Sequence, residues 1–413
     1  MEPTVEKTAA EAATSTNHDA DYIQKALALA YKSESLRVES FQSEPITQRG
    51  ENFCSVIYRI KVEYRKNENA PLEQGNYVLK DLLPIVAEVG SNEKVMFQEI
   101  LPAMAQILEK TSLEEHKLNA ECFFAERETS KEIYLLEDLC ALGYASMNRR
   151  KGLNLEDAQV CVHKLAQFHA ASMMLLHEQP ELVAKLSPSH YVDGLGDPFA
   201  QVIVVNGTAF GAEVVAELPG MAAIAAKMRA QLPSEYETRI KTVVNSKNTA
   251  MPVIVHGDLW LNNLMINAEQ KKAIIVDFQN CFIGSAAVDV QFFLYTSLQL
   301  DVLLQHREDL LKHYYQSLCQ TLTALNYPGS TLSYEQLAEE MQQCLFYAYY
   351  AVVCELPICC ASKDAAEDFT VDTFLSSESI LAKRRELFAN ERVIETLKAI
   401  LPYFDEQGIL DPL

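Results

Sequence analysis

Two short apolar runs in the second half of the chain each lead to an acidic side chain, and this pattern limits the possible fold most strongly. The run Val253–Val255 leads to Asp258, and Asn263 follows five residues later. A polar turn separates this segment from the run Ala273–Val276, which ends at Asp277. Short apolar runs bounded by turn residues are typical of buried strands. We therefore expect neighbouring strands that bring an Asp, an Asn and a second Asp to one cleft.

This combination of side chains suits phosphoryl transfer. Such a reaction needs one carboxylate to orient and deprotonate a hydroxyl, and oxygen ligands that hold Mg²⁺ on the phosphates. Because Mg²⁺ keeps several of its waters, one Asn and one Asp can suffice from the protein side. An Asp beside an apolar strand is also a common turn or cap residue. That alternative does not explain the joint spacing of Asp258, Asn263 and Asp277.

The first third of the chain predicts a small antiparallel sheet with one inserted helix. A helical stripe comes first, at residues 21–30, and Pro102 marks a break or a fresh start in a later helix, at residues 91–110. The polar turn 65–75 separates two strand signals and indicates a hairpin. The expected strands are residues 53–64, 76–80, 120–126 and 132–137.

After residue 138 the pattern becomes mainly helical. Residues 155–177 carry an apolar face at helical spacing, and nearly everything from residue 290 onward reads as helix. Only the short strands expected at 252–255, 264–266 and 273–276 interrupt it. We therefore expect an α+β fold with a flexible tail at 1–20, a β-rich lobe at 21–138 and a larger helical lobe at 139–413.

Charge and composition exclude several classes of partner. The chain has 35 basic and 57 acidic residues, a net charge of −22. Such a surface repels nucleic acid and anionic lipid. The most apolar stretch, Phe346–Cys354, is far shorter than the roughly 20 residues of a membrane span. The ten cysteines have no regular or metal-binding spacing, which is typical of thiols in a reducing compartment. We expect a cytoplasmic protein that binds neither nucleic acid nor membrane.

Several motifs occur together in a specific order. The pattern H-G-D-x-W-x-x-N-x-M stands at His256–Met265, and D-F-Q follows at Asp277–Gln279. Tyr77–Lys80, Glu137–Leu139 and the segment 165–172 match in the same order. From about Gly50 to its end, the chain resembles the ecdysteroid kinase-like family, in the small-molecule branch of the protein-kinase-like superfamily with aminoglycoside and choline kinases. The resemblance implies a two-lobed fold whose N-terminal lobe binds nucleotide and whose C-terminal lobe carries catalysis and binds substrate.

The resemblance also implies roles for individual residues. Asp258 would be the catalytic carboxylate, and Asn263 and Asp277 would bind Mg²⁺. Lys80 would contact the ATP phosphates and pair with Glu93. Glu99 is the alternative partner, but counting back from the Leu-Pro pair at 101–102 favours Glu93.

Further residues would complete the nucleotide site and its support. Gly50, Asn52 and Ser55 would cover the phosphates, and the backbone of Glu137 and Leu139 would hold the adenine edge. Two residues would support the site, His256 as an orienting residue and Asp289 as a helix cap or an anchor of the catalytic loop. His169 lies on the apolar face of its helix and is expected to be a hydrogen-bonded core residue.

The expected function is ATP- and Mg²⁺-dependent phosphorylation of a hydroxyl on a small molecule. Gly257 replaces the Arg of many protein kinases, and only eleven residues separate Asp277 from Asp289, so a peptide substrate is not expected. An ecdysteroid or a xenobiotic alcohol suits the aromatic residues of the helical lobe, which are Phe282, Tyr295, Phe346, Tyr347, Tyr349 and Tyr350. The alternatives are a choline- or ethanolamine-type kinase and a non-catalytic ligand-binding protein with the same fold.

Overall fold

The computed structural model describes residues 18–46, 55–362 and 384–413. Their contacts form two compact units. The described residues of the smaller unit are 18–46, 55–91 and 121–141, and those of the larger unit are 92–120, 142–362 and 384–413. The tail expected at 1–20 lies almost entirely outside the described residues.

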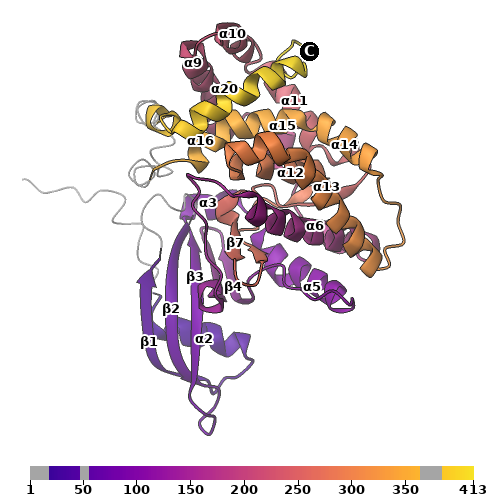
Figure 1. Ribbon diagram of the computed structural model, residues 1–413. Helices are drawn as coiled ribbons and strands as arrows, with labels where there is room; N and C mark the ends of the chain where they lie inside the picture. The colour runs from indigo at the N-terminus through magenta and orange to yellow at the C-terminus, as the bar shows by residue number, and fades with distance from the viewer. Residues whose placement is uncertain (1–17, 47–54, 363–383) are drawn as a thin grey trace, which may run out of the picture. The chain divides into compact units, whose positions relative to one another are not determined.

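The smaller unit is built on a five-stranded antiparallel sheet with the order β1-β2-β3-β5-β4 (Figure 1). The helix α2 packs on it through Ile23, Ala26 and Leu27. The expected hairpin 53–80 is present as β2 and β3, and the strands expected near 120–137 are present as β4 and β5. The elements of this unit are α2 (Ala20–Ala30), β1 (Arg37–Pro45), β2 (Ser55–Arg65), β3 (Glu73–Leu82), α3 (Pro84–Val89), β4 (Cys122–Glu128), β5 (Lys131–Glu137) and the 3₁₀ turn η2 (Leu139–Leu142).

The helix inserted between β3 and β4 groups with the larger unit, although the sequence placed it within the β-rich lobe. It consists of α4 (Glu93–Val95), a π-helical turn η1 (Met96–Ile100) and α5 (Leu101–Glu109). The side chain of Asn92 donates to the carbonyl of Cys281 at 2.6 Å, and the Phe97 ring packs edge-on against Phe278. These contacts hold the helix to the larger unit, because both partners belong to that unit.

The larger unit is mainly helical, as expected, and α12 (Ala286–Ser297) is buried along its whole length. It combines long helices with short helical turns. The other elements are α6 (Leu155–Glu178), α7 (Pro180–Val183), η3 (His190–Asp193), α8 (Pro198–Ala200), η4 (Gln201–Val205), α9 (Asn206–Glu217), α10 (Ala222–Ala230), α11 (Ser234–Val244), η5 (Ser246–Asn248), η6 (Leu261–Asn263), α13 (Leu300–Ala324), α14 (Tyr334–Gln343), α15 (Leu345–Tyr350), η7 (Ala351–Glu355), α16 (Leu356–Cys359) and α20 (Glu391–Glu406).

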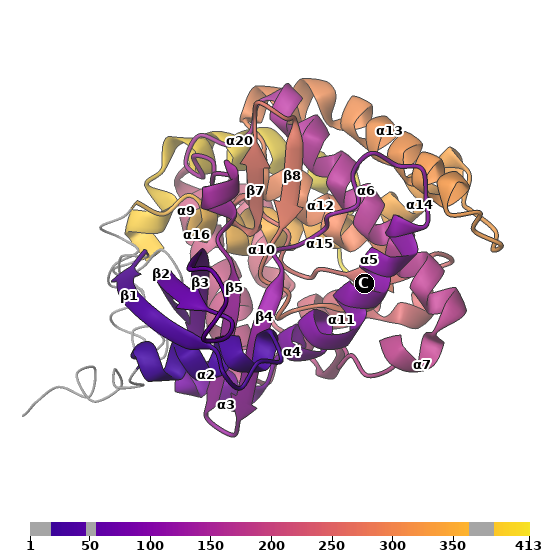
Figure 2. The ribbon, with the colours of Figure 1, turned by 90° about the horizontal axis from the view of Figure 1, so that it is seen from below.

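Two small antiparallel sheets lie among these helices. β6 (Pro252–Val255) pairs with β9 (Phe282–Ser285), and β7 (Leu264–Asn267) pairs with β8 (Lys272–Ile275). Figure 2 shows β7 and β8 side by side as a hairpin. The three strands expected here are β6, β7 and β8, whereas β9 was not expected. The α+β fold class predicted from the sequence is confirmed by the antiparallel sheet and the helical unit.

One helical stretch of the described residues, Pro198–Glu217, is long and apolar enough by length and composition to cross a membrane. The sequence predicts no stretch of this length, so this finding corrects that expectation. Of its apolar window, 44% is buried inside the protein. A single stretch of this kind does not establish a membrane segment, because buried core helices have the same length and composition.

Candidate active site

The loop that carries Asp258 begins where β6 ends, and its second position, occupied by Gly257, requires a glycine. Its φ is +82°, in the left-handed region that favours glycine. A Cβ atom added there would lie 2.3 Å from the carbonyl oxygen of Asn280. The loop can therefore lie this close to the segment after Asp277 only if position 257 has no side chain.

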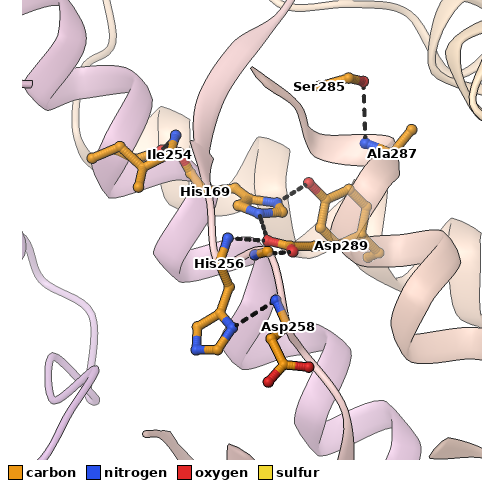
Figure 3. Close-up of polar contacts among 10 residues, drawn as sticks. His169, Ile254, His256, Asp258, Ser285, Ala287 and Asp289 are labelled. Atoms are coloured by element: carbon orange, nitrogen blue, oxygen red, sulfur yellow. Dashed lines mark hydrogen bonds and ion pairs between the residues drawn. The ribbon is translucent and has the colours of Figure 1, made fainter. Parts of the chain in front are cut away.

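The Asp289 carboxylate anchors this loop by accepting hydrogen bonds from the loop backbone (Figure 3). Its carboxylate accepts hydrogen bonds from the backbone N–H of His256 at 2.6 Å and of Gly257 at 3.0 Å. Asp289 lies in the first turn of α12, whose N-cap is Ser285 instead. Of the two roles considered for Asp289, the contacts are therefore those of a loop anchor.

A fully buried histidine on α6 supports Asp289 from behind. His169 Nε2 lies 3.1 Å from an Asp289 carboxylate oxygen (Figure 3). The other ring nitrogen, Nδ1, lies 2.7 Å from the Tyr314 hydroxyl. Because the carboxylate only accepts, Nε2 carries the proton and the Tyr314 hydroxyl donates to Nδ1 of the neutral ring. His169 is thus the hydrogen-bonded core residue that the sequence suggested, and it fixes the carboxylate that holds the loop.

The His256 side chain connects the two segments that carry the acidic residues. Its Nε2 donates to the carbonyl of Val276 at 3.0 Å, and its Nδ1 accepts from the backbone N–H of Asp258 at 3.3 Å. A carbonyl cannot donate, so this neutral tautomer follows from the partners. The imidazole ties the backbone of Asp258 to the residue before Asp277, which is an orienting role.

Asn263 lies against Asp258. Its side-chain nitrogen donates to the Asp258 carbonyl at 2.7 Å and to the Asp258 carboxylate at 3.0 Å. The Asn263 carbonyl accepts from the N–H of Val276 at 3.0 Å, which links η6 to the strand end before Asp277. Asp277 has a φ of +67°, which is uncommon for a residue other than glycine and is found at functional sites.

These side chains have the chemistry of a Mg²⁺ site that is completed by phosphate. The side-chain nitrogen of Asn263 bonds to Asp258, so the amide oxygen of Asn263 is the atom suited to a cation. The carboxylate of Asp277 is the other expected ligand. Within the described residues, no group of three or more His, Cys, Asp or Glu side chains could hold a metal. Cys354, Cys359 and Cys360 are free buried thiols.

The environment of Asp258 makes its carboxyl group a stronger base than usual. Burial raises its pKa well above the ordinary value, and the negative charges of Glu355 and Asp277 raise it further. The hydrogen bond from Asn263 acts in the opposite direction. An aspartate perturbed in this way is suited to accept a proton near neutral pH.

The two glutamates considered as partners of Lys80 lie in different environments. Glu93 is fully buried, and its carboxylate accepts from the backbone N–H of Phe278 at 3.2 Å. Glu99 is on the surface and forms an ion pair with Lys185. Glu93 therefore lies in contact with the segment that carries Asp277. The pairing with Lys80, which belongs to the smaller unit, stays a prediction.

The residues expected to bind nucleotide are in the smaller unit where they are described. Lys80 is buried on β3, opposite Ile57 and Tyr134. Ser55 begins β2, Glu137 ends β5, and Leu139 is buried in η2. Gly50 and Asn52 lie outside the described residues. The roles of these residues stay predictions.

Sequence reasoning missed one acidic residue near Asp258. Glu355 ends η7, and Tyr350 donates a hydrogen bond to it. The only signal was a charged residue that interrupts the apolar stretch beginning at Phe346. Of the aromatic residues proposed for a substrate pocket, Phe346 and Tyr349 pack with Tyr236 as core residues.

Comparisons with known proteins identify the family of the chain. The ecdysteroid kinase-like family model matches residues 49–327, and no curated protein matches the chain. Among similar solved structures, an ethanolamine kinase of Plasmodium vivax is 12% identical, with a TM-score of 0.44 over 90% of this chain and 92% of that one. A macrolide 2'-phosphotransferase type I is 15% identical, with a TM-score of 0.38 over 90% of this chain and 98% of that one. The choline kinase LicA of Streptococcus pneumoniae is 11% identical, with a TM-score of 0.39 over 81% of this chain and 99% of that one. The family match covers more than half of the chain and confirms the resemblance, and with it the two-lobed kinase-like fold. The chain belongs to the ecdysteroid kinase-like family.

Proposed function

We propose that the protein is an ATP- and Mg²⁺-dependent phosphotransferase that phosphorylates a hydroxyl of a small molecule. Family membership indicates a small-molecule kinase. The proposal of this reaction rests mainly on one observation: Asn263 joins Asp258 to the strand end before Asp277 by hydrogen bonds. The Asn263 side chain bonds to Asp258, and its backbone carbonyl accepts from the N–H of Val276, so hydrogen bonds join the base, one expected cation ligand and the residue before the other ligand, Asp277.

The reaction follows from these positions. Asp258 accepts the proton of the acceptor hydroxyl while that oxygen forms a bond to the γ-phosphorus of ATP and the bond from phosphorus to the leaving oxygen of ADP breaks. Bound Mg²⁺ would offset the negative charge of the phosphates. His256 and Asp289 keep the Asp258 backbone in place through the reaction, because both bond to the loop itself.

The family description favours an ecdysteroid or a xenobiotic alcohol as the acceptor. A second candidate, an amine-bearing alcohol of the choline or ethanolamine type, is favoured by the negative charge of Glu355 acting on Asp258. In this proposal Lys80 contacts the ATP phosphates, and the backbone of Glu137 and Leu139 contacts the adenine.

Replacement of Asp258 tests the proposal. Asp258→Asn keeps the shape of the side chain but removes the base, so turnover of a hydroxylated metabolite panel should fall by about 10²–10⁴-fold. Transfer would be followed by mass spectrometry of the phosphorylated product with Mg·ATP. The control is Asp309→Asn, because Asp309 lies on the surface of α13. Wild-type turnover in Asp258→Asn would exclude Asp258 as the base.

A thermal-shift measurement separates the kinase from a ligand-binding protein that does not bind nucleotide. Mg·ATP at a hundredfold excess over its dissociation constant would stabilise a nucleotide-binding protein by about 2.7 kcal/mol. The same shift should persist in Asp258→Asn, since Asp258 acts on the acceptor hydroxyl. A wild-type protein whose Tm does not change with Mg·ATP would contradict the proposal.

A further inference from the structure

Two tyrosine hydroxyl groups and one carboxylate form a directed chain in the larger unit. The hydroxyl of Tyr191, in η3, lies 2.8 Å from the hydroxyl of Tyr350, which ends α15. The Tyr350 hydroxyl also bonds to the carboxylate of Glu355, at the end of the π-helical turn η7. An ionised carboxylate only accepts, so Tyr350 donates to Glu355 and Tyr191 donates to Tyr350. Both hydroxyl protons are therefore directed toward Glu355. Single π-helical turns are frequent at functional sites.

Aromatic rings surround this chain. Tyr191 packs edge-on against Tyr350 with ring centroids 5.6 Å apart, and Tyr347 lies 5.1 Å from Tyr350. Phe292 of α12 packs against Tyr347 at 6.0 Å. The faces of such rings are electron-rich and attract cations. Tyr347 and Tyr350 are buried, whereas Tyr191 and Glu355 are half-buried.

Helix α12 connects Glu355 with the loop that carries Asp258. Its Asp289 accepts from the backbone N–H groups of His256 and Gly257. Its Phe292 packs against Tyr347 and against Tyr350, which donates to Glu355. Burial raises the pKa of Tyr347, and the charges of Glu355 and Asp258 are both among the causes. Asp258 is half-buried, like Glu355, so both carboxyl groups keep some contact with solvent.

Neither carboxylate has a basic partner in the part of the chain that the structure describes. The only hydrogen bond of the Glu355 side chain there is the one from Tyr350, and Asp258 is bonded by Asn263. A partly desolvated charge without an opposite charge is unfavourable. A neutral acceptor would leave Glu355 uncompensated, whereas a protonated amine would pair with it and contact the neighbouring rings.

We propose that Glu355, held by Tyr350 and Tyr191, binds a protonated amine of the acceptor whose hydroxyl faces Asp258. The inference rests on the proposed phosphotransferase function and names its substrate class as alcohols that carry an amine. Glu355 then determines specificity, and its distance from the base sets the spacing between amine and hydroxyl.

Binding of matched probes tests this inference without nucleotide. Ethanolamine, aminobutanol and aminohexanol would be titrated calorimetrically against ethanol, butanol and hexanol. We expect at least one amino alcohol to bind about 10–100-fold more tightly than its alkanol, because a hydrogen-bonded ion pair adds that much. A wild-type protein that shows no such preference, or that binds no member of any pair, contradicts the inference.

Substitution at Glu355 assigns the preference to this carboxylate. Glu355→Gln keeps an oxygen that accepts from Tyr350 but removes the charge, and it should abolish the amine preference. Tyr350→Phe should reduce the preference less, because the charge stays, and it serves as the second variant if Glu355→Gln does not fold. The matched control is Glu339→Gln, which removes one charge from an exposed position on α14. An unchanged preference in Glu355→Gln overturns the inference.

Kinetics distinguish a failure of this inference from a failure of the proposed function. In Glu355→Gln the KM for an amino alcohol should rise about 10–100-fold while the KM for ATP stays unchanged. Equal KM values for wild type and Glu355→Gln, together with transfer that depends on Asp258, would refute only the role of Glu355. Glu355-dependent amine binding without transfer to any acceptor would refute the phosphotransferase and leave an amine-binding protein.

Discussion

Asp289→Asn tests whether one buried carboxylate holds the catalytic loop. The wild-type carboxylate accepts three hydrogen bonds, from the N–H groups of His256 and Gly257 and from His169, and it is fully buried. Asparagine has the same shape but only one accepting oxygen. Its amide nitrogen must therefore face at least one of these donors.

The expected loss follows from that count. A hydrogen bond to a charged group contributes about 1.5–3 kcal/mol, and a buried donor without an acceptor is unfavourable. We therefore expect Asp289→Asn to lower the free energy of unfolding of the larger unit by about 2–4 kcal/mol. For a unit of this size the Tm should fall by roughly 5–10 °C. Turnover should fall as well, because small displacements of a catalytic group lower the rate steeply.

The protein contains its own reporter for this measurement. Trp260 is the single tryptophan of the chain, it is buried, and its backbone N–H donates to the carbonyl of Asp258 at 3.1 Å. Its fluorescence therefore follows unfolding next to the catalytic loop. Asp309→Asn is the matched control, since Asp309 is exposed and forms an ion pair with His306 on the same helix. A Tm for Asp289→Asn equal to that of the control would refute the anchoring argument.

Three further results are expected. Gly257→Ala should lower the Tm by more than the control does, because an added Cβ would lie 2.3 Å from the Asn280 carbonyl at a φ of +82°, and an unchanged melting curve would contradict this geometry. Glu93→Gln should lower turnover at least about tenfold whereas Glu99→Gln, at an exposed ion pair, should not, and equal activities would argue against the choice of Glu93. Burial and neighbouring charges raise the pKa of Asp258, and only its ionised form accepts a proton, so turnover should rise with pH through that raised value; a wild-type profile without this acidic limb would contradict the role.

The local part of the site could be predicted from sequence because it depends on neighbours in the chain. Apolar runs separated by short turns indicated β6, β7 and β8, and these strands fix where Asp258, Asn263 and the end of β8 lie. β1 gave no such signal, since all its residues are exposed or half-buried and it lacks the alternation of a half-buried strand. β9 has only four residues, one of them Gly284, and it forms only by pairing with β6.

The supporting contacts could not be predicted, because they join distant positions. His169 is 120 positions from Asp289 and 145 from Tyr314, yet it bonds to both. Nothing in the helical spacing of residues 155–177 identifies those partners. The inserted helix shows the same limit, since Asn92 bonds to Cys281, 189 positions away, and thereby joins the larger unit.

The acids of the larger unit differ in how many hydrogen bonds their carboxylates accept. This difference distinguishes acids that stabilise the fold from acids suited to bind a proton or a cation. Asp289 accepts three hydrogen bonds, and Glu340 accepts from two hydroxyl groups and a backbone N–H. Carboxylates satisfied in this way hold the fold together and have little capacity left for a ligand. Asp258 and Glu355 are half-buried, each is bonded by a single side chain, and burial raises the pKa of both. In sequence all four are acids beside apolar residues. Only the folded chain shows how many hydrogen bonds each carboxylate accepts. Asp258 and Glu355 accept few, which is why they are the two acids suited to accept a proton and to bind a cation.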